Sequence, residues 1–154
     1  MTQRNRLSAD DRLDIMDLIA RYAYTLDSGD LDGYVNNFAP EGVLFERHQG
    51  RDKIREYVAM LMREGRAGPL PDGDVAHRHF VGSPVIDGAD DRATVHSYLL
   101  WVSMGSEPPV SAAAEYTDEC VKLDGQWFFQ SRVLRRLAGR FPGSDPVIKQ
   151  QASV

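Results

Sequence analysis

The sequence predicts an α+β domain in which three helices lie on one face of a strongly curved antiparallel sheet. Before Gly65, apolar residues mostly recur at every third or fourth position, and from about residue 75 onward they alternate. The first spacing is helical and the second is that of strands, and 154 residues fit one domain. We expect a cone around an apolar cavity over residues 1–138, in the order helix, helix, strand, helix and four strands, followed by a C-terminal tail over 139–154.

The first helix is predicted to begin at a capping box. Ser8 is followed three residues later by Asp11, so that each side chain can bind a free amide of the first turn. Ser28 and Gly29 end the helix about five turns later. The apolar positions between these ends predict one buried stripe, made of Leu13, Met16, Ile19, Ala20, Ala23 and Leu26.

Two shorter helices flank a strand in the next segment. Asp30 caps a second helix that runs through Phe38 and stops at Pro40. Residues 42–46 are expected to form a strand. A third helix is predicted over residues 52–64 from the helical spacing of Ile54, Tyr57, Val58, Leu61 and Met62.

Four long strands are predicted in the rest of the chain, where Val, Phe, Tyr, Trp and Thr are frequent. They are expected at residues 75–86, 92–104, 110–123 and 126–137. Turn sequences separate them at Asp87-Gly88, Gly105 to Pro109 and Asp124-Gly125. Connections this short favour hairpins, so consecutive strands should pair antiparallel.

Composition excludes several classes of function. The net charge is −5, from 18 basic and 23 acidic residues, and the basic residues are scattered, which argues against a nucleic-acid partner. Cys120 is the only cysteine, so one chain can form neither an internal disulfide nor a cysteine-based zinc site. No signal peptide and no apolar run of membrane-spanning length is visible, and we therefore expect a cytoplasmic protein without a membrane partner.

Asp27 and two histidines are the first candidates for chemistry. Asp27 lies beside the buried stripe in the last turn of the first helix, where the helix dipole disfavours a carboxylate unless another group compensates it. An exposed turn residue in the segment 27–30 is the alternative. His77 and His79 lie two residues apart on one strand and must therefore share a face. This placement suits general acid–base catalysis as well as a structural role. A metal on these histidines is conceivable, but His-x-His is a weak signal, and we expect neither a metal nor a cofactor.

Other polar side chains are candidates of lower rank. Arg132 lies among large apolar neighbours and could stabilise an oxyanion or a leaving anion, although such arginines often extend to solvent. Tyr24, Glu46 and Tyr116 are candidate substrate-binding residues, each also consistent with a core or surface position. Of His96 and Ser97, only one can face the interior, and the alternation leaves open which one it is.

Four segments resemble the SnoaL-like group of the nuclear transport factor 2-like superfamily. They are LDSGDLD at 26–32, FAPEGV at 38–43, HFVG at 79–82 and GQWF at 125–128, and the likeness extends over about residues 7–137. The resemblance is greatest to scytalone dehydratase and hexachlorocyclohexane dehydrochlorinase. It implies that Asp27 orients His79 as the base and that Arg132 matches the late-strand arginine of the dehydrochlorinase. Leu26 stands where the dehydratase has a tyrosine, and Glu46 lies near the place of another.

The resemblance implies cofactor-independent proton abstraction from a small, hydrophobic and cyclic substrate. The step would lead to β-elimination, as in a dehydratase or dehydrohalogenase, or to isomerisation, with Asp27, His79 and Arg132 as catalytic residues. Tyr24, Glu46, His77 and Tyr116 would bind the substrate. Other relatives include polyketide cyclases, and the alternative is a non-catalytic ligand-binding protein or an accessory subunit of a ring-hydroxylating dioxygenase. A homodimer or a homotrimer is expected, because three helices cannot cover the outer face of the sheet.

Overall fold

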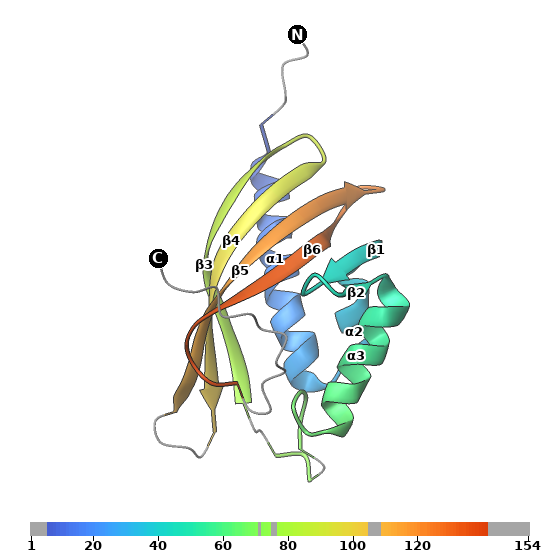
Figure 1. Cartoon of the computed structure of the whole chain (residues 1–154). Helices are drawn as coiled ribbons and strands as arrows, with labels where there is room; N and C mark the ends of the chain where they lie inside the picture. The colour runs from blue at the N-terminus through green and yellow to red at the C-terminus, as the bar shows by residue number, and fades with distance from the viewer. Residues whose placement is uncertain (1–5, 71, 75–76, 105–108, 142–154) are drawn as a thin grey trace.

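The computed structural model describes residues 6–70, 72–74, 77–104 and 109–141. Three helices and six strands lie in these ranges, and the strands form one curved, unclosed sheet in the order β2-β1-β6-β5-β4-β3. Figure 1 shows the sheet curving around α1, with α2 and α3 next to β1 and β2. The bounds are α1 Ala9–Ser28, α2 Leu31–Asn36, β1 Phe38–Leu44, β2 His48–Gln49, α3 Arg51–Arg63, β3 His77–Ala89, β4 Arg92–Ser103, β5 Val110–Leu123 and β6 Gln126–Gly139. The predicted α+β class and helix–strand order are confirmed, with one short strand added.

The capping box predicted for the first helix is present at the start of α1. The Ser8 hydroxyl accepts a hydrogen bond from the Asp11 amide, and the Asp11 carboxylate accepts one from the Ser8 amide. Gly29 ends the helix in the left-handed conformation, at φ 77°, which a glycine adopts without steric cost. Both ends of α1 are therefore encoded locally.

The buried stripe of α1 differs from the predicted one. Leu13 and Met16, which we expected inside, are 61% and 47% exposed. This helix has apolar side chains on two adjoining faces, and the sheet covers only one of them. The covered face consists of Ile15, Leu18, Ile19, Tyr22, Ala23, Leu26 and Asp27.

The sheet is mixed, whereas the sequence predicted an antiparallel one. β3, β4, β5 and β6 pair antiparallel in sequence order, as expected of hairpins. β1 pairs parallel with β6, with Phe38 opposite Phe129 and Leu44 opposite Arg132. One helix and four strands separate β1 from β6, so no hairpin imposes an antiparallel direction on this pair.

A tight turn after β1 produces the unpredicted strand. Phe45 and Glu46 have positive φ values of 52° and 60°, and the reversed chain forms β2 beside β1. The predicted second helix is also shorter than expected, because α2 ends at Asn36 and Phe38 already belongs to β1.

Aromatic side chains fill the space between the helices and the sheet. Tyr22 of α1 lies within 4.8 Å of Tyr34, 6.2 Å of Phe38 and 5.8 Å of Phe129, measured between ring centroids. All four residues are almost completely buried. Tilted and edge-to-face pairs of this kind stabilise beyond their buried area.

Two predictions concern the ends and the surroundings of the domain. Of the predicted tail, Phe141 is buried and packs on Trp101 with ring centroids 5.2 Å apart, while residues 142–154 lie outside the described part of the chain. Among the residues described, no helix combines the length and the apolar character needed to cross a bilayer.

Candidate active site

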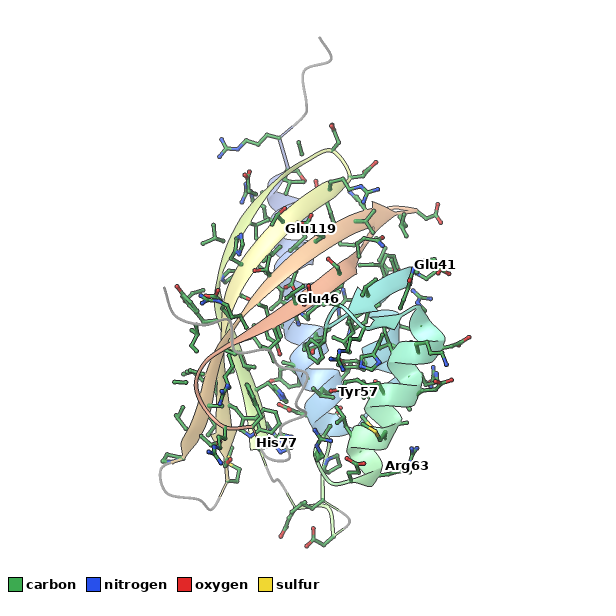
Figure 2. The ribbon with its side chains drawn as sticks, viewed as in Figure 1. Glu41, Glu46, Tyr57, Arg63, His77 and Glu119 are labelled. Carbon is green, nitrogen blue, oxygen red and sulfur yellow. The ribbon has the colours of Figure 1, made fainter. Side chains whose placement is uncertain are left out.

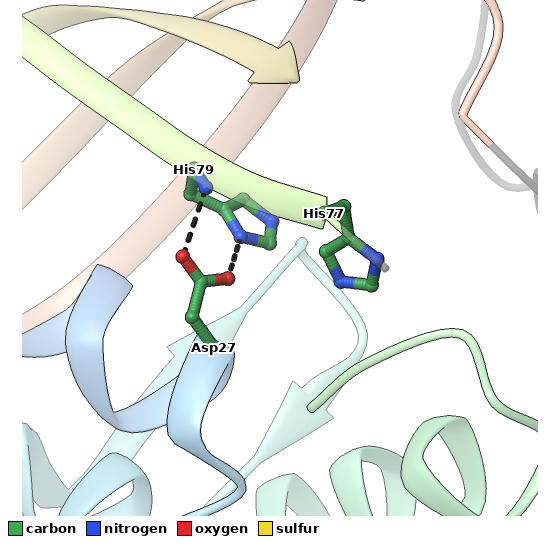
Figure 3. A group of neighbouring side chains, drawn as sticks. All are labelled: Asp27, His77 and His79. Carbon is green, nitrogen blue, oxygen red and sulfur yellow. Dashed lines mark hydrogen bonds and ion pairs between the residues drawn. The ribbon is translucent and has the colours of Figure 1, made fainter. Parts of the chain in front are cut away.

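Asp27 and His79 form a buried pair between α1 and β3. The Asp27 Oδ1 lies 2.6 Å from the His79 Nδ1, and the Asp27 Oδ2 accepts a hydrogen bond of 2.9 Å from the backbone amide of His79 (Figure 3). The side chains are only 8% and 4% exposed. Asp27 is therefore not an exposed turn residue, which was the alternative at the sequence level.

The local structure explains why this carboxylate is retained at an unfavourable place. The C-terminal end of α1 carries partial negative charge and repels Asp27. Two hydrogen bonds from one residue of β3 offset that repulsion, and one of them comes from a ring nitrogen. Because a carboxylate accepts the Nδ1 proton, the neutral imidazole has its lone pair on Nε2.

His77 lies beside the pair on the same face of β3. Its ring stacks on Trp101 at 4.3 Å between centroids and lies 5.7 Å from the ring of His79. The residue is buried, and its Nε2 has no hydrogen-bond partner within the described chain. Burial, reinforced by the nearby His79, lowers the pKa of His77 to about 4, so this imidazole is neutral near pH 7.

Trp101 is a site residue that sequence reasoning missed. It is opposite His79 in the β3–β4 register, and its ring meets that of His79 at 4.6 Å with an interplanar angle of 69°. The indole Nε1 is buried and unpartnered in the part of the chain described. Alternation placed Trp101 on one face of a predicted strand, but only the pairing register shows that it packs on both histidines.

Arg132 lies in the core and is held by an acidic partner that the sequence analysis did not single out. Its Nε and Nη2 donate to the two carboxylate oxygens of Asp118 at 2.8 and 2.7 Å. The guanidinium carbon also lies 4.0 Å from the ring centroids of both Tyr22 and Tyr116 and 4.2 Å from that of Phe129. None of the contacts described for Arg132 involves Asp27 or His79.

The remaining predicted residues are scattered. Tyr116 belongs to the cluster around Arg132, where burial raises its pKa well above the ordinary value. We expected Tyr24 and Glu46 to bind the substrate beside Asp27 and His79, the pair called the dyad below. Instead, Tyr24 is 78% exposed and Glu46 lies exposed in the turn after β1. Tyr24 is outside because the buried face of α1 passes through Tyr22, Ala23 and Leu26. Figure 2 shows His77 and Glu46 in separate parts of the molecule.

The open question about β4 is settled in favour of Ser97. Ser97 is buried with its hydroxyl unpartnered among the described residues, whereas His96 is exposed and contacts Thr117.

Three residues of the site could act together as metal ligands. Asp27, His77 and His79 each offer one ligand atom, and these atoms lie within 4.8 Å of one another.

The family model for the SnoaL-like domain matches residues 7–133, nearly the whole described domain. The chain belongs to the SnoaL-like family. A search of curated proteins finds no match to this SnoaL-like chain. The predicted membership is thus confirmed. Membership alone does not identify the reaction, which is argued below from the geometry of the site.

Solved structures agree with this family and its fold. A protein of unknown function with a cystatin-like fold from Nostoc punctiforme is 28% identical, with a TM-score of 0.74, over 84% of this SnoaL-like chain and 93% of its own. Two provisionally named proteins of Novosphingobium aromaticivorans are each 20% identical. A scytalone dehydratase aligns with TM-score 0.74 over 94% and 96% of the two chains, and an aromatic ring hydroxylase with TM-score 0.67 over 86% and 92%. At this identity the last two show the fold alone.

Proposed function

We propose that this SnoaL-like protein is a cofactor-independent lyase or isomerase in which His79 removes a proton from a small cyclic substrate. The observation that carries the proposal is the 2.6 Å contact between the Asp27 Oδ1 and the His79 Nδ1 inside a buried site. An imidazole anchored at Nδ1 by a carboxylate has a fixed orientation and a free lone pair on Nε2. This is the arrangement required of a general base.

The proposed reaction begins when Nε2 of His79 takes a proton from carbon. The imidazole becomes a cation, which the negative charge of Asp27 stabilises, and the electron pair remains on the substrate as an enolate or a related carbanion. In elimination, that pair forms a double bond while the leaving group departs from the neighbouring carbon with its own bonding pair. In isomerisation, His79 returns the proton to another carbon, and in either case the base is regenerated neutral after the proton leaves.

Negative charge on the substrate needs a donor close to His79. The geometry supports Trp101 for this role, because its indole packs on His79 and its N–H has no partner among the residues described. Arg132, the residue implied by the family resemblance, already gives its Nε and Nη2 to Asp118. We therefore propose the Trp101 N–H as the stabilising donor next to the dyad, with the neutral His77 as a further contact for the substrate.

Ligand binding without turnover is the second candidate function. It is favoured by the common fold of this chain and the protein named as an aromatic ring hydroxylase, because one fold supports unrelated activities. In that role the chain would bind a small hydrophobic molecule or serve as an accessory subunit of a ring-hydroxylating dioxygenase. The pairing of Asp27 with His79 favours the enzyme, since binding alone does not require an oriented base.

A substrate screen tests the proposal. Candidate hydroxy-ketones, halogenated rings and unsaturated cyclic ketones are incubated with the protein in deuterated buffer, and substrate loss and deuterium incorporation are followed. For a compound that reacts, Asp27→Asn and His79→Ala should each lower turnover by about a hundredfold or more. His96→Ala is the matched control, because that histidine is exposed on the neighbouring strand.

The outcomes separate the two functions. Unchanged turnover in both dyad variants contradicts the assignment of the site. Tight binding of a compound without reaction or exchange supports the ligand-binding protein instead. Circular dichroism of each variant confirms that a lost activity does not reflect a lost fold.

A further inference from the structure

His77 adds a third potential ligand to the pair of Asp27 and His79. The pair comes from the last turn of α1 and the third residue of β3, and His77 begins β3 two residues earlier. Each of the three offers one nitrogen or oxygen, and all these atoms lie within 4.8 Å of one another. The three side chains converge from two elements, as Figure 3 shows.

The surroundings of His77 favour a ligand that none of the described residues provides. The residue is 5% exposed, and its Nε2 has no partner in the described part of the chain. A buried polar nitrogen without a partner has lost its hydrogen bonds to water with nothing in their place, which is unfavourable. Trp101 covers the rings of both histidines, and Phe141 packs on Trp101, so the wall of the site is apolar.

The site also contains a hydrogen bond of the kind that orients metal ligands. The backbone amide of His79 fixes Oδ2 of Asp27, which orients the carboxylate and leaves Oδ1 towards the imidazoles. Hydrogen bonds of this kind orient ligating carboxylates in metal sites. The set is two nitrogens and one oxygen, which suits Zn²⁺ and similar divalent transition ions better than Mg²⁺ or Ca²⁺.

We propose that Asp27, His77 and His79 bind one divalent transition-metal ion, with Zn²⁺ as the best fit, and that the bound ion inhibits the enzyme. The inhibition rests on the function proposed above, whereas the binding does not. A metal on Nε2 of His79 takes the lone pair of the base. A metal on Nδ1 binds the tautomer in which that proton has moved to Nε2, so both arrangements remove the base.

The three ligand atoms lie within 4.8 Å of one another, and zinc binding would require them to move to tetrahedral distances. Tetrahedral zinc with bonds of about 2.0–2.2 Å places its ligand atoms about 3.4 Å apart. The Asp27 and His79 atoms, now 2.6 Å apart, separate slightly, and the His77 ring turns inward. Three protein ligands leave one position of the ion open for water.

Titration with metal alone tests the binding. The chain is freed of metal with EDTA and exchanged into buffer, and Zn²⁺ binding is measured by calorimetry while Co²⁺ is followed by visible absorption. We expect one ion per chain and a Co²⁺ spectrum typical of low coordination. His77→Phe keeps a ring on Trp101 but removes the ligand, and should weaken binding by about tenfold or more. His96→Phe, on the exposed face, is the matched control and should bind as the unaltered chain does.

The results are decisive whether or not a substrate is known. Absence of binding at about 100 µM metal, or equal binding by the His77→Phe and His96→Phe variants, overturns the site. Once a substrate is known, Zn²⁺ should abolish turnover and EDTA should restore it. Binding without inhibition would overturn the inhibitory half and leave the general-base proposal to its own test.

Discussion

Arg132 and Asp118 form a bidentate ion pair in the interior of the domain, with both side chains 0% exposed. Three aromatic rings surround the guanidinium at 4.0–4.2 Å, which adds cation–π attraction to the charge pairing. Burying two charges is costly, and the cost is offset only while each group has its partner. The pair joins β5 to β6 beneath α1, so the stability of the whole core depends on it.

The first prediction follows from this dependence of each charge on the other. Asp118→Ala leaves the guanidinium buried and uncompensated, and should lower the free energy of unfolding by about 3–5 kcal/mol. Replacing both residues, by Asp118→Leu with Arg132→Met, removes both charges and should recover much of that loss. Denaturant unfolding followed by circular dichroism measures all three proteins.

A second pair on the same two strands provides the control. Arg135 and Glu115 also join β6 to β5 at 2.6 Å, but their side chains are 52% and 30% exposed. Glu115→Ala should therefore cost no more than about 1 kcal/mol. Equal losses in Glu115→Ala and Asp118→Ala would show that burial does not set the importance of the inner pair.

The two tryptophans allow a second, matched prediction. The Trp127 N–H donates to the Asp11 carboxylate at 2.9 Å, whereas the Trp101 N–H is buried without a partner among the described residues. Trp127→Phe should therefore lower stability by about 1.5–3 kcal/mol, the range of a hydrogen bond to a charged group, and leave turnover unchanged. Trp101→Phe should lower turnover by about tenfold or more and lower stability less, because no hydrogen bond to a described residue is lost. The opposite assignment of the two losses would remove Trp101 from the proposed mechanism.

Local signals in the sequence predicted most of the helices and strands, but not the complete pairing of the sheet. The capping box of Ser8 and Asp11, the glycine after α1 and the Asp124-Gly125 turn each act within a few residues, and the structure contains all of them. Pairing between strands that lie far apart in the sequence could not be predicted from local signals. The parallel contact of β1 with β6 joins residues about ninety positions apart, and no periodicity encodes it.

The same limit explains what could be predicted of the site. The anomaly of Asp27, a carboxylate beside a buried helical stripe, is visible in one helix, but the partner, His79, was implied only by the family resemblance. Arg132 was recognised as a cation among apolar neighbours, with burial left open, and its partner Asp118 lies on another strand and appears only when the register is known. Trp101 went unnoticed for the same reason. Tyr24 was placed by its proximity to Asp27 in sequence, although the two side chains differ in exposure because they lie on different faces of α1.

A third prediction concerns acid stability and Asp11. Lys122 first, then Ser8 and Trp127, hold the pKa of the Asp11 carboxyl well below its ordinary value of 3.8. Since the folded-state pKa is below the unfolded one, the carboxylate stabilises the fold fully above about pH 4 and progressively less as the pH falls. Asp11→Asn resembles the protonated form in shape. The difference in unfolding free energy between the unaltered chain and Asp11→Asn should therefore be largest near pH 6 and shrink towards pH 2, as measured by urea unfolding. A difference that is constant with pH would contradict this assignment.

The last prediction concerns self-association through the outer face of the sheet. Phe80 and Leu100 are direct partners across β3 and β4, and Tyr98 lies two residues away on the same face, opposite Gly82. These side chains are 58%, 44% and 58% exposed. Adjacent apolar side chains on an uncovered face are typical of interfaces, so we expect the 17.3 kDa chain to form a homodimer or a homotrimer through this face. Leu100→Glu buries an unpaired charge in such an interface and should shift the mass towards the monomer, whereas Leu13→Glu alters an equally apolar but separate position on α1 and should not. Light scattering at micromolar concentration measures both variants. A monomeric unaltered chain, or the same mass for both variants, would contradict this prediction.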